Sequence, residues 1–226
     1  MTCVIPARIG SKRLARKNIA LFRGKPILAY SIEQALASRL FDRVYVATES
    51  EEIADIARKW GAVVPFLTPV ELSGDANGSL EPCMFLLGEL EKQGERYENM
   101  FCAQPTSVLR KAHHFLEAYR LFKDSELEFC ASVNAVDPHD FHWVVEEEQI
   151  GRGKLFFGKK WLKDRSELPP FYSLNGAIKL GNVEALRRDG HFFNAAFAVY
   201  KMTRRESFFL YTQDDLNFLD TIFDAK

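Results

Sequence analysis

A basic loop near the N-terminus carries the residues whose types and spacing are best suited to chemistry. The loop starts after the apolar segment that ends at Ile5. It contains one glycine, one serine and five cations, namely Gly10, Ser11, Arg8, Lys12, Arg13, Arg16 and Lys17. Exposed backbone N–H groups can point at anionic oxygens while the cations supply charge at close range. The pattern predicts a phosphate cradle, and a solvated basic turn is the alternative.

The position of this loop favours the phosphate cradle. The loop directly follows the first predicted strand of an α/β pattern, where the carboxyl ends of parallel strands form the ligand crevice. Its spacing matches neither the Walker motif nor G-x-G-x-x-G, so an ordinary NTPase or dinucleotide fingerprint is excluded. A different kind of phosphorylated ligand is therefore expected here.

Several further motifs follow in order along nearly the whole chain. They are Pro6-Ala7-Arg8-x-Gly10-Ser11-Lys12-Arg13 with Lys17-Asn18, Phe22-x-Gly24-Lys25-Pro26, Val46-Ala47-Thr48-Glu49-Ser50, Gln104-Pro105-Thr106-Ser107 and Asn175-Gly176-Ala177-Ile178. Together they resemble the acylneuraminate (CMP-sialic acid synthetase) cytidylyltransferases. This resemblance implies transfer of CMP from CTP to an acidic nine-carbon 2-keto sugar, with release of pyrophosphate.

The resemblance also implies roles on the nucleotide side. Arg8 and Lys17 match catalytic cations, and Lys12 would join them in cradling the phosphates. Gly10 and Ser11 would present backbone N–H groups to the same oxygens. The remaining nucleotide contacts that the resemblance implies are Asn18 and, on the cytosine ring, Ser79.

Three positions match contacts to the acceptor sugar. Gln104 and Asn175 match amides that contact sugar hydroxyl and acyl groups, although each alone could be a turn or cap residue. Arg165 falls where the family often keeps an arginine for the acidic sugar, and a guanidinium fork suits a carboxylate. Arg110 is interpreted as a surface charge or a salt-bridge partner near a helix N-terminus.

The C-terminal metal-binding motif of the family is altered. The resemblance implies Mg²⁺ held by two aspartates, but this chain has Phe209 and Tyr211 at those positions. Aromatic side chains cannot replace hard anionic oxygen ligands. Asp214 and Asp215 follow closely, where a helix-capping role is expected. Other family residues are replaced at Ile9, Ala15, Thr68, Val108 and Lys179, of which Thr68 stands for a cytosine-contacting arginine and Lys179 for a tyrosine.

These departures leave three hypotheses open. The chain is a cytidylyltransferase, a catalytically silent relative that binds a nucleotide or sugar as a partner subunit, or a nucleotidyltransferase with another base or sugar preference. The discriminating feature is a substitute carboxylate near the phosphates, for which Glu49, Asp75 and Asp214 are candidates.

Length and composition indicate one soluble domain over residues 1–226, and the resemblance implies that it is a nucleotidyltransferase domain. A formal net charge of −1, with cations gathered near the N-terminus, fits a small phosphorylated ligand better than nucleic acid. Four widely spaced cysteines in apolar surroundings predict reduced core thiols. With neither a signal peptide nor an apolar run of about 18 residues, a cytoplasmic protein without membrane contact is expected.

Hydrophobic periodicity predicts an α/β fold with a mostly parallel sheet and helices on both faces, and the resemblance implies the Rossmann-like nucleotide-diphospho-sugar transferase type. Strands are expected at 1–6, 42–48, 63–67, 99–103, 129–133, 173–180 and 196–201. Helices are expected at 26–38, 51–59, 80–93, 111–123, 183–189 and 214–224. Residues 138–170 lack a steady period and are rich in aromatics, which predicts an excursion of hairpins and loops with an association surface; a locally packed satellite cluster is the alternative. In the family this segment protrudes and joins two subunits, so the resemblance implies a homodimer.

Overall fold

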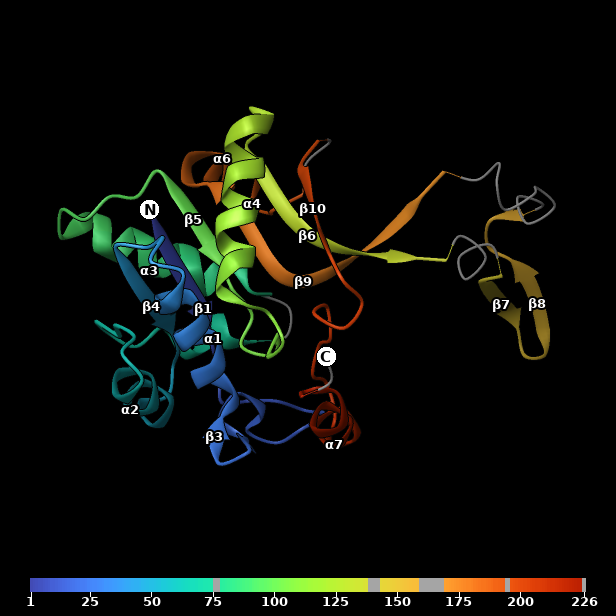
Figure 1. Ribbon diagram of the computed structural model, residues 1–226, viewed down its shortest axis with the longest axis horizontal. Coiled ribbons are helices and arrows are strands. Elements are labelled where there is room, and N and C mark those ends of the chain that lie inside the picture. The colour runs from blue at the N-terminus through green and yellow to red at the C-terminus, as the bar shows by residue number, and fades with distance from the viewer. Residues whose placement is uncertain (75–77, 138–142, 159–168, 194–195, 225–226) are drawn as a thin grey trace.

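A mixed six-stranded sheet forms the centre of the protein. The computed structural model describes residues 1–74, 78–137, 143–158, 169–193 and 196–224. The strands stand in the order β10-β6-β9-β5-β1-β4 (Figure 1). Their bounds are β1 Thr2–Pro6, β4 Arg43–Ala47, β5 Asn99–Cys102, β6 Phe129–Val136, β9 Phe171–Asn182 and β10 Ala198–Met202. Strand β9 runs antiparallel to β5 and β6, whereas the other pairs are parallel, so the predicted mostly parallel sheet is confirmed.

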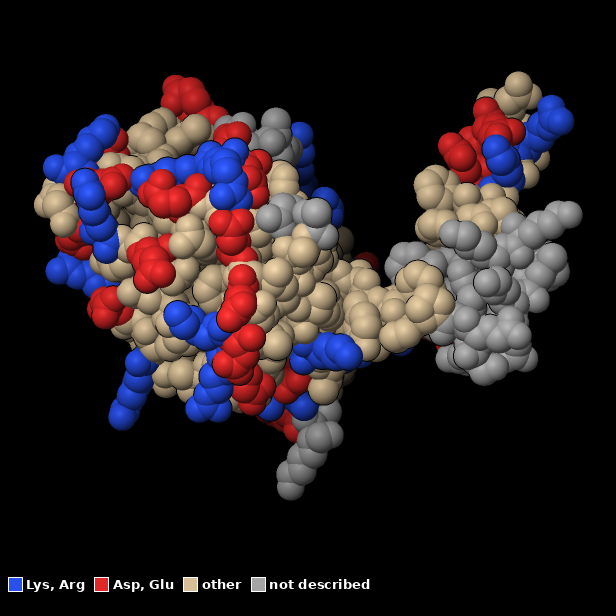
Figure 2. Space-filling view, turned by 90° about the horizontal axis from the view of Figure 1, so that it is seen from above, with Lys and Arg blue, Asp and Glu red and all other residues tan. Residues whose placement is uncertain are grey.

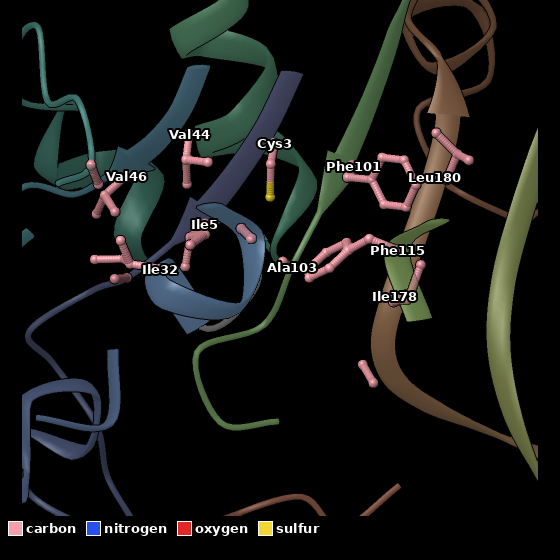
Figure 3. Packing of buried hydrophobic residues seen from close by; sticks show 14 of the residues in the cluster. Cys3, Ile5, Ile32, Val44, Val46, Phe101, Ala103, Phe115, Ile178 and Leu180 are labelled. Atoms are coloured by element: carbon pink, nitrogen blue, oxygen red, sulfur yellow. The ribbon is translucent and has the colours of Figure 1, made fainter. Parts of the chain in front are cut away.

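Helices cover both faces of this sheet. Their bounds are α1 Ile27–Ala37, α2 Glu51–Lys59, α3 Leu80–Lys92, α4 Ala112–Ser125, α6 Val183–Asp189 and α7 Gln213–Ile222. Helices α1, α2 and α4 contribute to one buried cluster, and α3 and α6 contribute to a second. Alternate residues of β1 supply both clusters: Cys3 and Ile5 face the first, where Figure 3 shows them beside Ile32 and Val44, and Val4 faces the second.

A third, smaller cluster fixes the C-terminal part of the chain. Helix α7 packs through Leu219 against Phe22 and Tyr30, close to the two-stranded hairpin of β2 (Leu21–Phe22) and β3 (Lys25–Pro26). Arg23 in this hairpin reaches Asp220 of α7 at 2.7 Å. The segment before α7 is therefore tied to the N-terminal third of the chain, next to the basic loop.

Local signals in the sequence account for the ends of α2. The Ser50 side chain accepts a hydrogen bond from the Ile53 N–H, as an N-cap does, and Glu51 and Glu52 lie in the positive first turn. After the helix, Gly61 adopts φ +92°, a left-handed conformation that suits glycine. The predicted bounds of this helix are confirmed.

The predicted strand at 63–67 is wrong. Only Val63 pairs, as an isolated bridge to Tyr45, with Val63 N–H donating to the Val44 carbonyl at 2.8 Å. Pro65 has no backbone N–H to continue the ladder. The segment therefore leaves the sheet and becomes a loop containing the short 3₁₀ helix η2 (Val70–Ser73).

A hairpin of β7 (Val145–Gln149) and β8 (Arg152–Leu155) stands apart from the main body. Strands β6 and β9 extend outward toward it in Figure 1, and Figure 2 shows its separation from the body. Its apolar side chains are exposed, including Trp143 at 57%, Ile150 at 102% and Phe156 at 60%. This hairpin lies within the predicted excursion, whose residues 138–142 and 159–168 lie outside the described ranges, and its role in association stays a prediction.

Candidate functional site

A cavity of about 500 Å³ opens at the carboxyl ends of β1, β4 and β5. Segments far apart in the sequence line it, as expected for a crevice at the edge of an α/β sheet. The predicted site residues that line it are Arg8, Ser11, Lys17, Asn18, Ser79, Gln104 and Asn175. Gly10 and Lys12 belong to the same basic loop without lining the cavity, and Arg165 lies outside the described residues.

The basic loop is held in place by hydrogen bonds at its root. The Asn18 amide, buried at 8% exposure, donates to the Arg8 carbonyl at 2.8 Å. The Ile9 N–H donates to Glu49 Oε1 at 2.9 Å, and the Arg8 guanidinium reaches the Ser73 carbonyl at 3.0 Å. Asn18 therefore anchors the loop through the backbone, whereas Arg8 spans the cavity from β1 to the opposite loop.

Replacing a glycine by Ile9 does not strain this loop. Among the described residues of the loop, the left-handed conformation falls on Arg16, at φ 55°, and not on Ile9. The Arg16 side chain forms an ion pair with Glu52 on α2. Arg16 is therefore directed toward a surface carboxylate, which separates it from the cations that line the cavity.

Lys17 sits in a strongly positive setting at the cavity wall. Burial, followed by the charges of Arg13 and Arg8, lowers the pKa of the Lys17 ammonium, and Asp215 opposes this shift. Its Nζ lies 5.8 Å from the Phe209 ring centroid and 5.5 Å from that of Tyr211. The loop and the altered C-terminal motif therefore meet at one end of the cavity.

The three proposed substitute carboxylates are Glu49, Asp75 and Asp214, and Asp215 is the neighbouring carboxylate for which a capping role is expected. Asp215 closes a capping box on α7: it accepts the N–H groups of Tyr211 and Thr212, each at 2.8 Å, which confirms its predicted capping role. Asp214 is exposed in the first turn of α7 and does not line the cavity, and Asp75 lies outside the described residues. Glu49 is the carboxylate among the described lining residues.

Three buried polar atoms of the lining residues lack a hydrogen-bond partner within the described part of the chain. They are Glu49 Oε2, Thr68 Oγ1 and Thr106 Oγ1. Buried polar groups are nearly always hydrogen-bonded in native proteins. Their presence around one cavity is typical of a site whose hydrogen bonds are completed by a ligand.

The two predicted amides on the acceptor side are not equivalent. The side-chain amide of half-buried Gln104 has no partner among the described residues and is available to a ligand. By contrast, Asn175 Oδ1 accepts from Ser132 Oγ and the Ala177 N–H, and its Nδ2 donates to Ser207 Oγ at 2.7 Å. Asn175 thus binds β9 to the C-terminal segment and shapes the wall of the cavity.

Lys179 on β9 places a further cation in the cavity. Its ammonium donates to Ser79 Oγ at 3.0 Å and lies 5.7 Å from the Phe192 ring centroid. Within the described residues no carboxylate forms an ion pair with it. The four cysteines are buried and form no disulfide bond, which confirms the predicted thiols.

Arg110 corrects the sequence interpretation of a surface charge. Its guanidinium is 1% exposed and donates to the Ala177 carbonyl at 2.6 Å and Ser31 Oγ at 2.8 Å. Burial lowers the pKa of Arg110 to about 10. Arg110 also contacts the Gln104 carbonyl at 3.4 Å, so it fixes the loop that presents Gln104. The surrounding motif carried no sign of this burial, because its partners are distant in sequence.

A second residue missed from the sequence is His114, at the start of α4. It lies with His113 and Glu206 in a group whose side-chain ligand atoms are within 4.8 Å of one another. However, the Lys111 N–H donates to His114 Nδ1 at 3.0 Å, so the ring hydrogen belongs on Nε2, which faces Glu206 at 3.5 Å. This arrangement caps the helix and leaves no imidazole lone pair for a metal.

Fold and site together define an α/β protein with a ligand crevice at the carboxyl ends of its parallel strands. The chain superposes on CMP:2-keto-3-deoxy-manno-octonic acid synthetase in complex with CTP with a TM-score of 0.75 over 98% of this chain and 97% of that one, at 14% identity. A 4-diphosphocytidyl-2C-methyl-D-erythritol synthase gives a TM-score of 0.68 over 99% and 97%, at 15% identity. These likenesses show the fold.

Sequence comparison shows the family. The model of the cytidylyltransferase family matches residues 2–223, and the chain belongs to that family. It is 32% identical to a pseudaminic acid cytidylyltransferase of Campylobacter jejuni, over 99% of this chain and 96% of that one. It is 30% identical to the CMP-N,N'-diacetyllegionaminic acid synthase of Legionella pneumophila, over 84% and 82%. The predicted family is confirmed.

None of the described helices combines the length and apolar character needed to cross a membrane.

Proposed function

We propose that this protein transfers CMP from CTP to the anomeric hydroxyl of an acidic nine-carbon 2-keto sugar. In this reaction the hydroxyl oxygen bonds to the α-phosphorus and gives its proton to water, the bond from that phosphorus to the bridging oxygen breaks, and pyrophosphate leaves with the electron pair. The observation that carries the proposal is the meeting of Arg8, Lys17, Ser79 and Gln104 at one cavity in a chain of this family.

The nucleotide side follows from the placement of the cations. Arg8 and Lys17 would stabilise negative charge that grows on the phosphate oxygens, while Ser11 would donate from the loop backbone. Lys12 and Gly10 belong to the same loop, the first as a further cation and the second as a flexible backbone position. Ser79 and the unpartnered Thr68 hydroxyl lie on the opposite wall, where the base would bind.

The acceptor side is expected between Gln104 and β9. Gln104 offers an unused amide, and Lys179 offers a half-buried ammonium to an acidic sugar. Both groups lie within reach of the cavity, whereas Asn175 would act by holding the wall. Arg165 remains a proposed contact to the sugar carboxylate.

The metal implied by the family does not fit the C-terminal segment of this chain. Phe209 and Tyr211 supply no carboxylate oxygen, and Asp215 caps α7 with Oδ2 and does not line the cavity. Since Mg²⁺ prefers carboxylate and phosphate oxygens, this segment lacks the paired ligands of the family motif.

The protein is further proposed to act as a cytoplasmic homodimer. Four reduced, buried thiols suit a reducing compartment. The exposed apolar side chains of the β7–β8 hairpin favour association with a second copy.

Mass spectrometry of reaction mixtures tests the proposed chemistry. The protein is incubated with each of the four nucleoside triphosphates and with neuraminate, legionaminate, pseudaminate and an eight-carbon keto sugar acid. A CMP-sugar with one of the nine-carbon acids is the expected product. A product with another base would favour the altered specificity, whereas CTP binding without any product would favour the silent relative, which Phe209 and Tyr211 support.

A further inference from the structure

Two aromatic side chains form the wall of the cavity where the family resemblance places metal-binding aspartates. The rings of Phe209 and Tyr211 lie 4.6 Å apart between centroids, inclined by 40°. Both line the cavity together with Lys17 and Arg8. Their position is fixed from behind by α7, whose capping box uses the Tyr211 and Thr212 N–H groups.

Cations of the basic loop lie over these rings. Arg13 Cζ is 4.9 Å from the centroid of Tyr211, and Lys17 Nζ is 5.5 Å from the same ring. An aromatic face attracts a cation through its quadrupole without neutralising the charge. The aromatic pair therefore holds the charge of Lys17 at the cavity wall and that of exposed Arg13 against Tyr211.

This arrangement leaves positive charge only partly compensated. Burial, followed by the charges of Arg13 and Arg8, lowers the pKa of Lys17 against the opposing charge of Asp215, so the charged form of Lys17 is disfavoured in this setting. A polyanion placed against Arg13 and Lys17 would favour that charged form. A divalent cation at the same position would instead be repelled by both.

Carboxylates offset these cations only in part within the described part of the cavity. The charge of Asp215 acts on Lys17, but Asp215 does not line the cavity, and its Oδ2 accepts the hydrogen bonds that cap α7. Glu49 binds the Ile9 N–H with Oε1, so it leaves one buried oxygen, Oε2, without a described partner. The donor set thus offers cations to phosphate oxygens, and it lacks the paired carboxylates of the family motif.

We infer that Arg13 and Lys17, held against Phe209 and Tyr211, neutralise the CTP phosphates in place of a metal ion, so that CTP binds without a divalent cation. The inference rests on the proposed function, since it takes the phosphates to lie in this end of the cavity.

Calorimetric titration of CTP into the protein tests the inference. Titrations are run with excess MgCl₂ and with EDTA at matched ionic strength. The expected dissociation constants agree within about threefold or favour EDTA, because metal-free CTP carries more negative charge. A loss of about tenfold or more in EDTA overturns the inference and leaves the proposed function standing. Absence of CTP binding under both conditions overturns both.

Restoring the aspartates supplies the converse test. The double variant Phe209→Asp with Tyr211→Asp is expected to make CTP binding sensitive to EDTA by about tenfold. Phe218→Asp, which adds a carboxylate at a 53% exposed phenylalanine of α7, is the control and should stay insensitive. Tyr211→Asp alone, at a 45% exposed position, serves if the double variant does not fold. Insensitivity of the folded aspartate variant would overturn the role given to the aromatic pair.

Lys17→Met tests the cation itself. In EDTA this variant is expected to lose about tenfold or more in CTP affinity, and tripolyphosphate should cease to compete with CTP. Unchanged affinity in EDTA would overturn the inference. Thermal unfolding of the variant without ligand checks that the fold is retained.

Discussion

At the residue scale, Lys179 is the side chain whose replacement should separate the two substrates. Lys179→Met removes a half-buried ammonium whose described hydrogen bond goes to the Ser79 hydroxyl. Because an acidic sugar would supply the missing counter-charge, its KM should rise by about tenfold. The KM for CTP should rise less, by about threefold, because Ser79 loses its hydrogen bond to Lys179.

Steady-state kinetics with each substrate varied in turn measures this difference. Lys59→Met, at an exposed position of α2, is the control and should leave both values unchanged. A rise in the KM for CTP, with the sugar unaffected, would place Lys179 beside the base and contradict the expectation.

His114 gives the fold a dependence on pH. Burial, followed by the charge of His113, lowers its pKa from 6.5 to about 4, against the smaller opposing effects of Glu206 and Glu117. Above pH 6.5 the neutral ring is favoured in both states. As the pH falls from 6.5 toward 4, this histidine binds a proton in the unfolded chain but stays neutral in the folded chain, so the free energy of unfolding decreases.

Denaturant unfolding across this pH range checks the effect. The free energy of unfolding should fall more for the natural protein than for His114→Gln, by on the order of 1–2 kcal/mol once solvent screening is allowed for. Parallel pH profiles for the two proteins would show that His114 keeps its ordinary pKa.

Arg8, Ser11, Lys17, Asn18 and Ser79 could be placed at one cavity through the resemblance, and for the basic loop also because it follows β1 at the ligand edge of the sheet. What could not be foreseen was how each polar atom is used. Asn175 and Arg110 depend on partners many residues away, such as Ser207 and Ser31. Sequence spacing carries no record of such contacts.

At the element scale, Arg110 joins three elements that shape the acceptor side. Arg110→Met would remove the hydrogen bonds to Ala177 on β9 and Ser31 on α1, leaving buried polar groups unpaired. The free energy of unfolding should fall by about 2–4 kcal/mol. Arg120→Met, at an exposed position of α4, should change it by less than about 0.5 kcal/mol.

Urea titration of both variants measures these changes. A small effect at Arg110 would mean that water or a shifted loop replaces the guanidinium without loss. In that case Arg110 would not be the group that fixes Gln104.

Elements were predictable wherever their signals are local. Helix α2 has its N-cap Ser50 and its terminating Gly61 within its own sequence, and α6 was likewise bounded correctly. The segment at 63–67 had the apolar character of a strand, yet Pro65 ends its pairing. The antiparallel direction of β9 depends on its route back into the sheet, which no local pattern specifies.

At the scale of the whole molecule, the projecting hairpin should decide association. Trp143→Glu with Ile150→Glu places charge on two exposed apolar positions, 57% and 102% accessible. If the hairpin packs against a second copy, the variant should be monomeric, because burying a carboxylate without a partner is costly. Leu21→Glu, at a 64% exposed position on β2, is the control and should remain dimeric.

Light scattering after size-exclusion chromatography measures the mass of each protein. A natural protein that is monomeric at micromolar concentration would contradict the proposed dimer. A dimer that persists in the double variant would show that the interface lies outside the β7–β8 hairpin.

The central claim is nucleotidyl transfer by this cavity, and release of pyrophosphate tests it most directly. Purified protein is assayed with CTP and a panel of acidic nine-carbon keto sugars, with Mg²⁺ and with EDTA. Sugar-dependent release is expected with CTP and one nine-carbon acid, and Lys17→Met should reduce it at least about tenfold. No release with any sugar from protein that is folded and binds CTP would contradict the claim.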